Sequence, residues 1–262
     1  MTWAIVQYDN RPLNEKYIKL MERNKQYCKK HGYDHIFVSQ EYELPPYWRK
    51  VKLVQETLPN YTGVLWLDTD ATVYNIDKPL DSFQKAGKSF YYSPDGPLWS
   101  SEMNAGVWLI INDETGRGIM DKWFSSYSSN DWVREGTKWT SKGDWAGSTY
   151  EQGAFVKLVK AVYVSALEIH PWQTFQSFEA SPEAFTFHFA GELEDKYLPT
   201  FLDSLPNEPL PQKEDSHEQN GFYVVVAIIL CICISIIFLT YQALTHSPGR
   251  PPPRGSVGFH LW

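Results

Sequence analysis

The chain has 262 residues, of which 43% are hydrophobic and 21% charged, and these proportions exclude a protein that is disordered throughout. Its net charge is −7, from 24 basic and 31 acidic residues, without the basic excess that is typical of nucleic-acid binders. Of the three cysteines only Cys28 lies outside an apolar run, which excludes a disulfide framework in the globular part. We therefore expect a folded protein with no nucleic-acid partner.

Strands and helices are predicted to alternate along residues 1–204. Apolar residues recur at helical spacing between Asn14 and His31, and Gly32 follows as the expected end of that helix. The alternation predicts one α/β domain with a mostly parallel central sheet, in which ligands bind beyond the carboxyl ends of strands. The expected strands are 3–8, 35–39, 64–68, 105–111 and 162–164, and the expected helices are 14–31, 49–58, 115–127 and 151–159.

A transmembrane helix is predicted near the C-terminus. Residues 222–239 contain 18 consecutive residues without a charge, about the length that crosses a hydrocarbon core. We place the helix at 222–241, after a polar linker at 205–221 and before a disordered, proline-rich tail at 242–262. The sequence is therefore expected to encode a single-pass membrane protein.

The orientation of that helix depends on two opposing signals. The opening residues lack the features of a signal peptide, so the domain is expected to fold before the anchor is made and to face the cytoplasm. The two arginines of the tail favour the reverse arrangement, with the domain on the lumenal side. We favour the cytoplasmic orientation and leave the lumenal one open.

Two carboxylates, Asp68 and Asp70, follow the apolar strand at 64–68. Residues two apart in an extended chain point to the same side, so both carboxylates can reach one divalent cation. Such a cation can hold a diphosphate and neutralise the charge that develops on it as a leaving group. This pattern suits an enzyme in which a nucleotide diphosphate is the leaving group.

The same residues allow a second interpretation. Asp68, Asp70 and Thr72 also resemble the nucleophile loop of haloacid-dehalogenase-type phosphohydrolases, in which the first aspartate attacks phosphorus. Those enzymes need a later acidic motif. Asp144 begins one candidate, but Ser148 stands where its second carboxylate is needed. We keep the phosphohydrolase as an alternative.

Six segments in one order resemble the GMA12/MNN10 family of galactosyl-, mannosyl- and xylosyltransferases. They are RNKQYCKKHGYDHIFV (23–38), YWRKVKLVQETL (47–58), WLDTDATVYN (66–75), MNAGVWLIIND (103–113), YEQGAF (150–155) and FTFHFAG (185–191). The resemblance implies a GT-A fold, which is a Rossmann-like nucleotide-diphospho-sugar transferase domain. It also implies transfer of a hexose or pentose to a glycan or glycoprotein acceptor, with retention at the anomeric carbon.

The resemblance also implies roles for individual residues. Asp68 and Asp70 would face the nucleotide and a divalent metal, Mn²⁺ or else Mg²⁺, and His188 would be the third protein ligand. Asn104 would hydrogen-bond the donor sugar, Gly191 would let the backbone approach the diphosphate, and Lys196 would contact a phosphate.

Gln152 and Glu151 would lie beside the reacting centre as the catalytic candidates. The family usually has aspartate where this chain has Glu151, so the longer arm moves the carboxylate. Lys50 either reaches the nucleotide or is a solvated helix lysine. Two further alternatives stay open: an inactive glycosyltransferase-fold binding protein, and self-glucosylation of the kind that glycogenin performs.

Overall fold

The computed structural model describes residues 1–41 and 43–205 of the chain. The predicted linker, the predicted membrane helix at 222–241 and the tail lie outside these residues. No helix of the described part has the length and apolar content that a membrane crossing requires. The anchor therefore stays a prediction.

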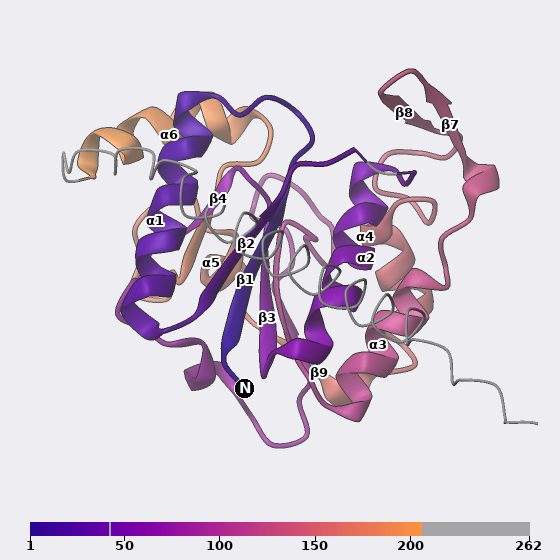
Figure 1. The fold of residues 1–262 in the computed structure, drawn as a ribbon, viewed down its shortest axis with the longest axis horizontal. Coiled ribbons are helices and arrows are strands. Elements are labelled where there is room, and N and C mark those ends of the chain that lie inside the picture. The colour runs from indigo at the N-terminus through magenta and orange to yellow at the C-terminus, as the bar shows by residue number, and fades with distance from the viewer. Residues whose placement is uncertain (42, 206–262) are drawn as a thin grey trace, which may run out of the picture. The chain divides into compact units, whose positions relative to one another are not determined.

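A six-stranded sheet forms the centre of the domain, in the order β2-β1-β3-β6-β5-β9 (Figure 1). Strands β2, β1 and β3 run parallel, as do β5 and β9, but β6 is antiparallel to both β3 and β5. The strands are β1 (Trp3–Tyr8), β2 (Asp34–Val38), β3 (Gly63–Leu67), β5 (Phe90–Tyr92), β6 (Val107–Ile111) and β9 (Leu167–Ile169).

The mostly parallel sheet that we predicted is thus a mixed sheet. Strand β5 connects to β6 through residues 93–106, which contain no helix, so the chain reverses and the two strands pair antiparallel. The strand expected at 162–164 is also wrong. A 3₁₀ turn occupies Val164–Ala166 and the strand begins at Leu167, because Val162 and Val164 are 64% exposed and do not join the core.

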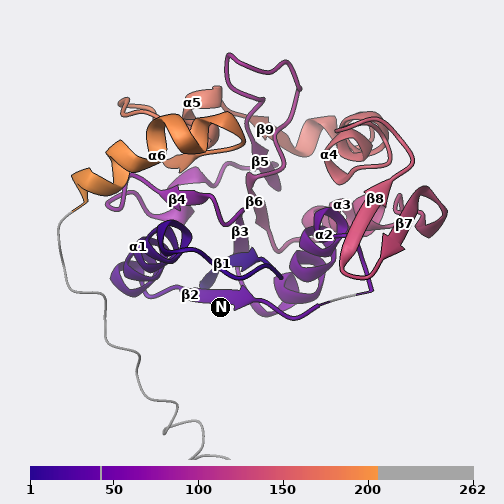
Figure 2. The same ribbon diagram turned by 90° about the horizontal axis from the view of Figure 1, so that it is seen from above.

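Helices cover both faces of the sheet (Figure 2). Helices α1 (Glu15–His31) and α6 (Glu192–Ser204) lie on one side, and α2 (Pro46–Thr57) and α3 (Glu114–Phe124) lie on the other. The predicted helix at 14–31 is confirmed: the Asn14 side chain caps it and Gly32, at φ 68°, ends it. Helix α2 begins earlier than predicted because Pro46 occupies its first position, where no amide hydrogen is needed.

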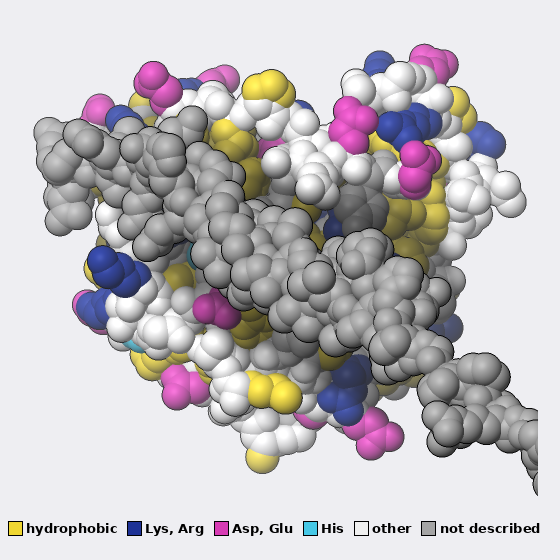
Figure 3. Space-filling view, in the orientation of Figure 1, with side chains coloured by type: hydrophobic (Ala, Val, Ile, Leu, Met, Phe, Trp, Pro, Cys, Tyr) yellow, Lys and Arg dark blue, Asp and Glu magenta, His cyan; other side chains and the backbone are white. Residues whose placement is uncertain are grey.

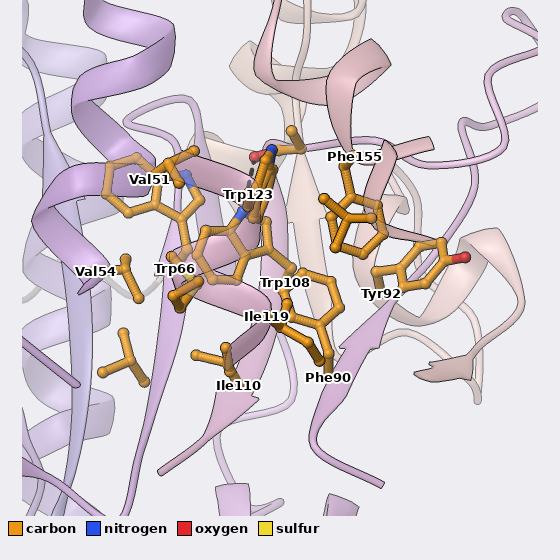
Figure 4. Packing of buried hydrophobic residues seen from close by; sticks show 14 of the residues in the cluster. Val51, Val54, Trp66, Phe90, Tyr92, Trp108, Ile110, Ile119, Trp123 and Phe155 are labelled. Atoms are coloured by element: carbon orange, nitrogen blue, oxygen red, sulfur yellow. Dashed lines mark hydrogen bonds between the residues drawn. The ribbon is translucent and has the colours of Figure 1, made fainter. Parts of the chain in front are cut away.

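Aromatic side chains dominate the core between the sheet and helices α2 and α3 (Figure 4). Phe90, Trp108, Trp123 and Phe155 are fully buried, and their ring centroids lie 4.8 to 5.8 Å apart. Trp66 stacks on Trp108 and is 1% exposed, as expected for a residue that packs in the sheet. Much of the aromatic content therefore serves packing.

Smaller elements complete the domain. Two short strands, β4 and β10, pair antiparallel beside the main sheet, and β7 and β8 form a separate hairpin. The helix predicted at 151–159 is observed as α4 followed by a π-helical turn. Their bounds are β4 (Ala71–Val73), β7 (Trp132–Glu135), β8 (Lys138–Ser141), β10 (Thr186–His188), α4 (Glu151–Ala154), the π turn (Phe155–Val159), α5 (Trp172–Gln176) and 3₁₀ turns at Leu58–Asn60, Leu80–Phe83 and Ser129–Asp131.

Candidate functional site

Strand β3 delivers Asp68 and Asp70 to the carboxyl edge of the sheet. The strand is buried along its whole length, and a tight turn follows it, in which the Ala71 amide donates to the Asp68 carbonyl at 3.0 Å. Neighbouring segments fix this turn. The Asp68 amide donates to the Gly106 carbonyl at 2.8 Å, and the Phe189 amide donates to the Asp70 carbonyl at 3.0 Å. Both carboxylates are therefore held in defined positions.

His188 reaches the same place through the pairing of β10 with β4. The register sets His188 opposite Ala71, the residue after Asp70. One ligand atom from each of Asp68, Asp70 and His188 lies within 4.8 Å of the other two, and His188 Nε2 is 3.3 Å from Asp70 Oδ1. The structure thus brings together the three residues that were predicted as metal ligands.

The orientation of the His188 ring suits a metal ligand. Gln176 Nε2 donates to the Val107 carbonyl at 3.1 Å, so its Oε1 is left to accept from His188 Nδ1 at 2.6 Å. The Nε2 lone pair then faces the carboxylates. Burial alone would lower the pKa of His188, but the Asp70 carboxylate raises it above its ordinary value. Two carboxylates and one oriented imidazole are a donor set that fits Mn²⁺ or Mg²⁺.

Lys50 is buried beside the cluster, so it is not the solvated helix lysine that we left open. Its ammonium lies 2.9 and 3.1 Å from the two Asp68 carboxylate oxygens and 3.3 Å from Glu151 Oε1. Burial alone would lower the pKa of Lys50, but the Asp68 and Glu151 carboxylates raise it above its ordinary value. Lys50 therefore stays charged and joins the turn after β3 to helix α4.

The two catalytic candidates are both held by hydrogen bonds or ion pairs. Glu151 is 4% exposed; burial raises its pKa although the Lys50 ammonium opposes this effect. Its longer side chain extends to Lys50. Gln152 accepts from the Ala105 amide at 2.9 Å and donates to Ser101 Oγ at 3.1 Å. Both residues lie at the start of α4, where each is held by the contacts above.

The remaining predicted residues divide into two groups. Asn104 donates to Asp95 Oδ1 at 2.6 Å, and it lines a small hollow together with His188. Gly191 begins helix α6 at φ 56°, a backbone conformation that favours glycine. The structure does not bring Lys196 into the cluster. That residue is exposed on α6 and its ammonium lies 4.9 Å from the Tyr197 ring centroid.

An open cleft of about 280 Å³ adjoins Asp68 and Asp70, and the sequence analysis did not predict the part of its lining that comes from Tyr8 to Arg11. This part lies at the end of β1, which is parallel to β3 in the sheet and therefore ends at the same edge. The sequence could have predicted this part of the cleft, because Asp9 and Arg11 follow an apolar strand just as Asp68 and Asp70 do. The lining residues are Tyr8, Asp9, Asn10, Arg11, Pro46, Tyr47, Lys50, Trp66, Asp68, Thr69 and Asp70.

Residues 3–84 match the galactosyl transferase GMA12/MNN10 family. No curated protein matches the chain. Among solved structures, a glycosyltransferase involved in the glycosylation of the major capsid of PBCV-1 is 20% identical. The similarity covers 76% of this chain and 100% of that one, with a TM-score of 0.60.

Two galactosyltransferase structures are more distant. A Drosophila β1,4-galactosyltransferase 7 mutant, in complex with manganese, UDP-Gal and xylobiose, is 11% identical with a TM-score of 0.44 over 82% of this chain and 79% of that one. The galactosyltransferase LgtC, with donor and acceptor sugar analogues, is 14% identical with a TM-score of 0.41 over 83% and 99%. Residues 3–84 are thus similar to the GMA12/MNN10 family, and the domain shares the fold of the PBCV-1 glycosyltransferase.

Proposed function

We propose that this chain transfers a hexose or pentose from a nucleotide diphosphate sugar to a glycan or glycoprotein acceptor, in a metal-dependent reaction. The observation that carries the proposal is the meeting of Asp68, Asp70 and His188 beside the open cleft. A bound divalent cation, expected to be Mn²⁺ with Mg²⁺ as the alternative, would neutralise the charge that develops on the departing diphosphate.

Different residues would bind the cation, the nucleotide and the sugar. Asp68, Asp70 and His188 would hold the cation, and the cleft would hold the nucleotide. Asn104, whose amide donates to Asp95 and accepts from the Gly106 amide, would hydrogen-bond a sugar hydroxyl. The buried Lys50 holds the carboxylate of Glu151 in one position.

Retention at the anomeric carbon is part of the proposal. Of the two catalytic candidates, Glu151 is paired with Lys50 and Gln152 is an amide, so neither is proposed as a nucleophile. We infer a reaction on one face of the sugar, in which Glu151 and Gln152 face the positive charge that develops on the ring. Linkage analysis of the product tests this proposal, and an inverted anomeric centre would contradict it.

The phosphohydrolase alternative is less well supported. The acidic motif that it needs lacks its second carboxylate, because Ser148 stands at that position. The inactive binding protein is disfavoured because all three predicted metal ligands are present and close together. Self-glucosylation would appear as a ladder of added sugar masses on the purified protein.

Membrane anchoring through residues 222–241, with the catalytic domain toward the cytoplasm, is also proposed from the sequence. Protease protection of sealed microsomes tests it. A cytoplasm-facing domain is digested without detergent, whereas a lumenal domain is protected until detergent is added.

Donor hydrolysis by the full-length chain is the experiment that tests the activity. A panel of nucleotide sugars is incubated with Mn²⁺ or with EDTA, and the released nucleoside diphosphate is measured. We expect release from one donor, abolished by EDTA and lowered about 10²- to 10³-fold in Asp70→Asn. Asp77→Asn is the matched control, because Asp77 is an exposed carboxylate that pairs with Lys30 on the surface.

Two results would contradict the proposal. One is the absence of release from every donor by a folded protein. The other is phosphatase activity with Mg²⁺ that depends on Asp68, because this result would favour the phosphohydrolase.

A further inference from the structure

Trp145 is the most exposed of the tryptophans that the structure describes. Its side chain is 73% exposed, and it lies against the rings of Tyr47 and Tyr150 at centroid distances of 5.6 and 5.0 Å. Tyr47 also stacks with Trp132 at 5.9 Å. We call these four residues, Tyr47, Trp132, Trp145 and Tyr150, the aromatic platform. Trp145 thus presents a large ring to solvent with two further rings packed against it, a surface on which the apolar face of a ligand can lie.

The loop that carries Trp145 is held firmly although it lies on the surface. Ala146 adopts φ 55°, a left-handed conformation that residues other than glycine rarely take. A Cβ atom on Gly153 would lie 2.2 to 2.3 Å from the carbonyl oxygens of the two residues after Trp145, so the loop packs directly on the backbone of α4. Trp48 Nε1 also donates to the Thr149 carbonyl at 2.8 Å. The ring is therefore presented by a built support.

The aromatic platform is continuous with the cleft. Tyr47 lies in the first turn of α2 and lines the cleft together with Lys50 and Asp68. Tyr150 directly precedes α4, which begins with Glu151. The hairpin β7–β8, which contributes Trp132, lies beyond the start of α2 (Figure 1). A molecule on the platform would thus extend toward the reacting centre.

We propose that the aromatic platform is a subsite for a neutral sugar ring of the acceptor. This inference rests on the proposed function. A pyranose presents a face of C–H groups that packs on an indole or phenol ring, while its hydroxyls stay in water. The platform offers the exposed ring of Trp145, with the rings of Tyr47 and Tyr150 packed against it.

The surroundings favour a neutral saccharide over an anionic one. Charged side chains of both signs surround the hairpin, where Arg134 pairs with Glu41 and Glu43 (Figure 3). Because Arg134 offsets only one of these two carboxylates, the surface does not attract an anionic ligand.

The donor base is the rival occupant, and the position of Trp145 argues against it. Trp145 does not line the cleft, whereas Tyr8 and Tyr47 do, beside the ion pair of Asp9 and Arg11. A base held in the cleft therefore has aromatic neighbours without Trp145.

Fluorine NMR of the full-length chain labelled with 5-fluorotryptophan tests the inference directly. The Trp145 resonance is assigned through Trp145→Phe. The probes are methyl glycosides of glucose, galactose, mannose and xylose, with sorbitol as a control that carries hydroxyls but no ring face. We expect the Trp145 resonance to shift saturably with at least one glycoside, and not with sorbitol or UDP.

Three results would overturn the inference. They are no shift with any glycoside, a shift with UDP alone, and a shift with phosphatidylcholine vesicles in place of the glycosides. The first removes the saccharide subsite, the second assigns the platform to the donor base, and the third assigns it to a lipid surface.

Kinetics separate this inference from the proposed function. Donor hydrolysis needs no acceptor, so Trp145→Ala should leave its rate and the donor KM unchanged while weakening glycoside binding about three- to ten-fold. Trp139→Ala, on the hairpin that carries Trp132 but outside the platform, is the matched control and should leave both unchanged. If no donor is hydrolysed the proposed function fails. If hydrolysis is normal and glycoside binding is unaffected by Trp145→Ala, only the platform assignment fails.

Discussion

Gln176 fixes the tautomer and the orientation of the His188 imidazole. Its amide is anchored on the Val107 carbonyl, so its oxygen must accept from His188 Nδ1, and Nε2 is left to face Asp70. Such partners orient ligands and make them more basic, and their loss typically lowers metal affinity 10- to 100-fold. We expect Gln176→Leu to raise the Kd for Mn²⁺ by about this factor, as measured by electron paramagnetic resonance of free Mn²⁺.

A conservative variant distinguishes orientation from packing. Gln176→Glu keeps an acceptor for Nδ1 and should bind Mn²⁺ more tightly than Gln176→Leu. Equal affinities of the two variants would mean that Gln176 only fills space.

The Lys50 ammonium pairs with two carboxylates, those of Asp68 and Glu151, and both pairs stabilise the fold. Removal of the ammonium leaves Glu151 buried without a partner, a change that costs about 3–5 kcal/mol for a buried pair. We expect Lys50→Met to lower the free energy of unfolding by this amount in urea titrations. The double variant Lys50→Met/Glu151→Gln should recover part of the loss. A single variant as stable as the parent would contradict the buried pairing.

The sequence predicted the ligands better than their supports. Asp68 and Asp70 were predictable because a carboxylate pair after an apolar strand has its own chemistry, and His188 was added by the family resemblance. Gln176 was not predictable, since its role depends on α5 lying behind β10, a contact between segments that no local pattern encodes. The pairing of Lys50 with Glu151 was missed for the same reason, because they lie on different helices.

At the scale of elements, the backbone before β6 approaches the His188 side chain closely, and this contact determines the position of the imidazole. Gly106 precedes β6, and a Cβ atom there would lie 2.1 Å from His188 Cε1 and 2.6 Å from Nε2. We expect Gly106→Ala to displace the imidazole and to raise the Kd for Mn²⁺ at least ten-fold, with a loss of about 1–3 kcal/mol in stability from overpacking. Both are measured on the purified full-length chain, by Mn²⁺ titration and by urea unfolding.

Gly96→Ala is the control for this change. The nearest atom to a Cβ at that position is on the Trp172 ring at 3.4 Å, an ordinary contact, so metal affinity should not change. Retention of full affinity in Gly106→Ala would show that the ring moves aside without effect.

The elements themselves were predicted unevenly. Long helices with caps, such as α1, and fully apolar strands, such as β3, were predicted within a residue or two because local pattern alone specifies them. The direction of β6 was not, since an antiparallel return through residues 93–106 leaves no mark on the strand itself. Strands β4 and β10 have three residues each, too few for a periodicity to be recognised.

At the scale of the whole molecule, a buried polar network links the sheet to the turn that carries the carboxylates. Gln7 is fully buried on β1; it donates to the Asp68 carbonyl at 3.2 Å and accepts from Asn24 of α1 at 3.2 Å. Asn24 in turn accepts from the Val73 amide at 2.9 Å. Stability of the domain and geometry of the site are therefore coupled, because the same side chains serve both.

His35 extends this network to β2 and makes the stability of the domain depend on pH. Its Nε2 donates to Gln7 Oε1 at 2.8 Å, and burial lowers the pKa of His35 to about 4. In the unfolded chain the pKa of His35 is about 6.5, so between pH 6.5 and 4 the unfolded chain binds a proton that the folded chain does not. The contribution of His35 to the free energy of unfolding is therefore complete above pH 6.5 and falls as the pH drops toward 4. The expected loss at pH 4 is about 3 kcal/mol from this residue. Urea unfolding at a series of pH values measures it, and in His35→Gln this part of the pH dependence should disappear.

His170 also has a pKa that burial lowers. Its titration should make the free energy of unfolding depend on pH in both the parent and the variant. Parallel curves for the parent and the variant would show that His35 titrates alike in the folded and unfolded chains.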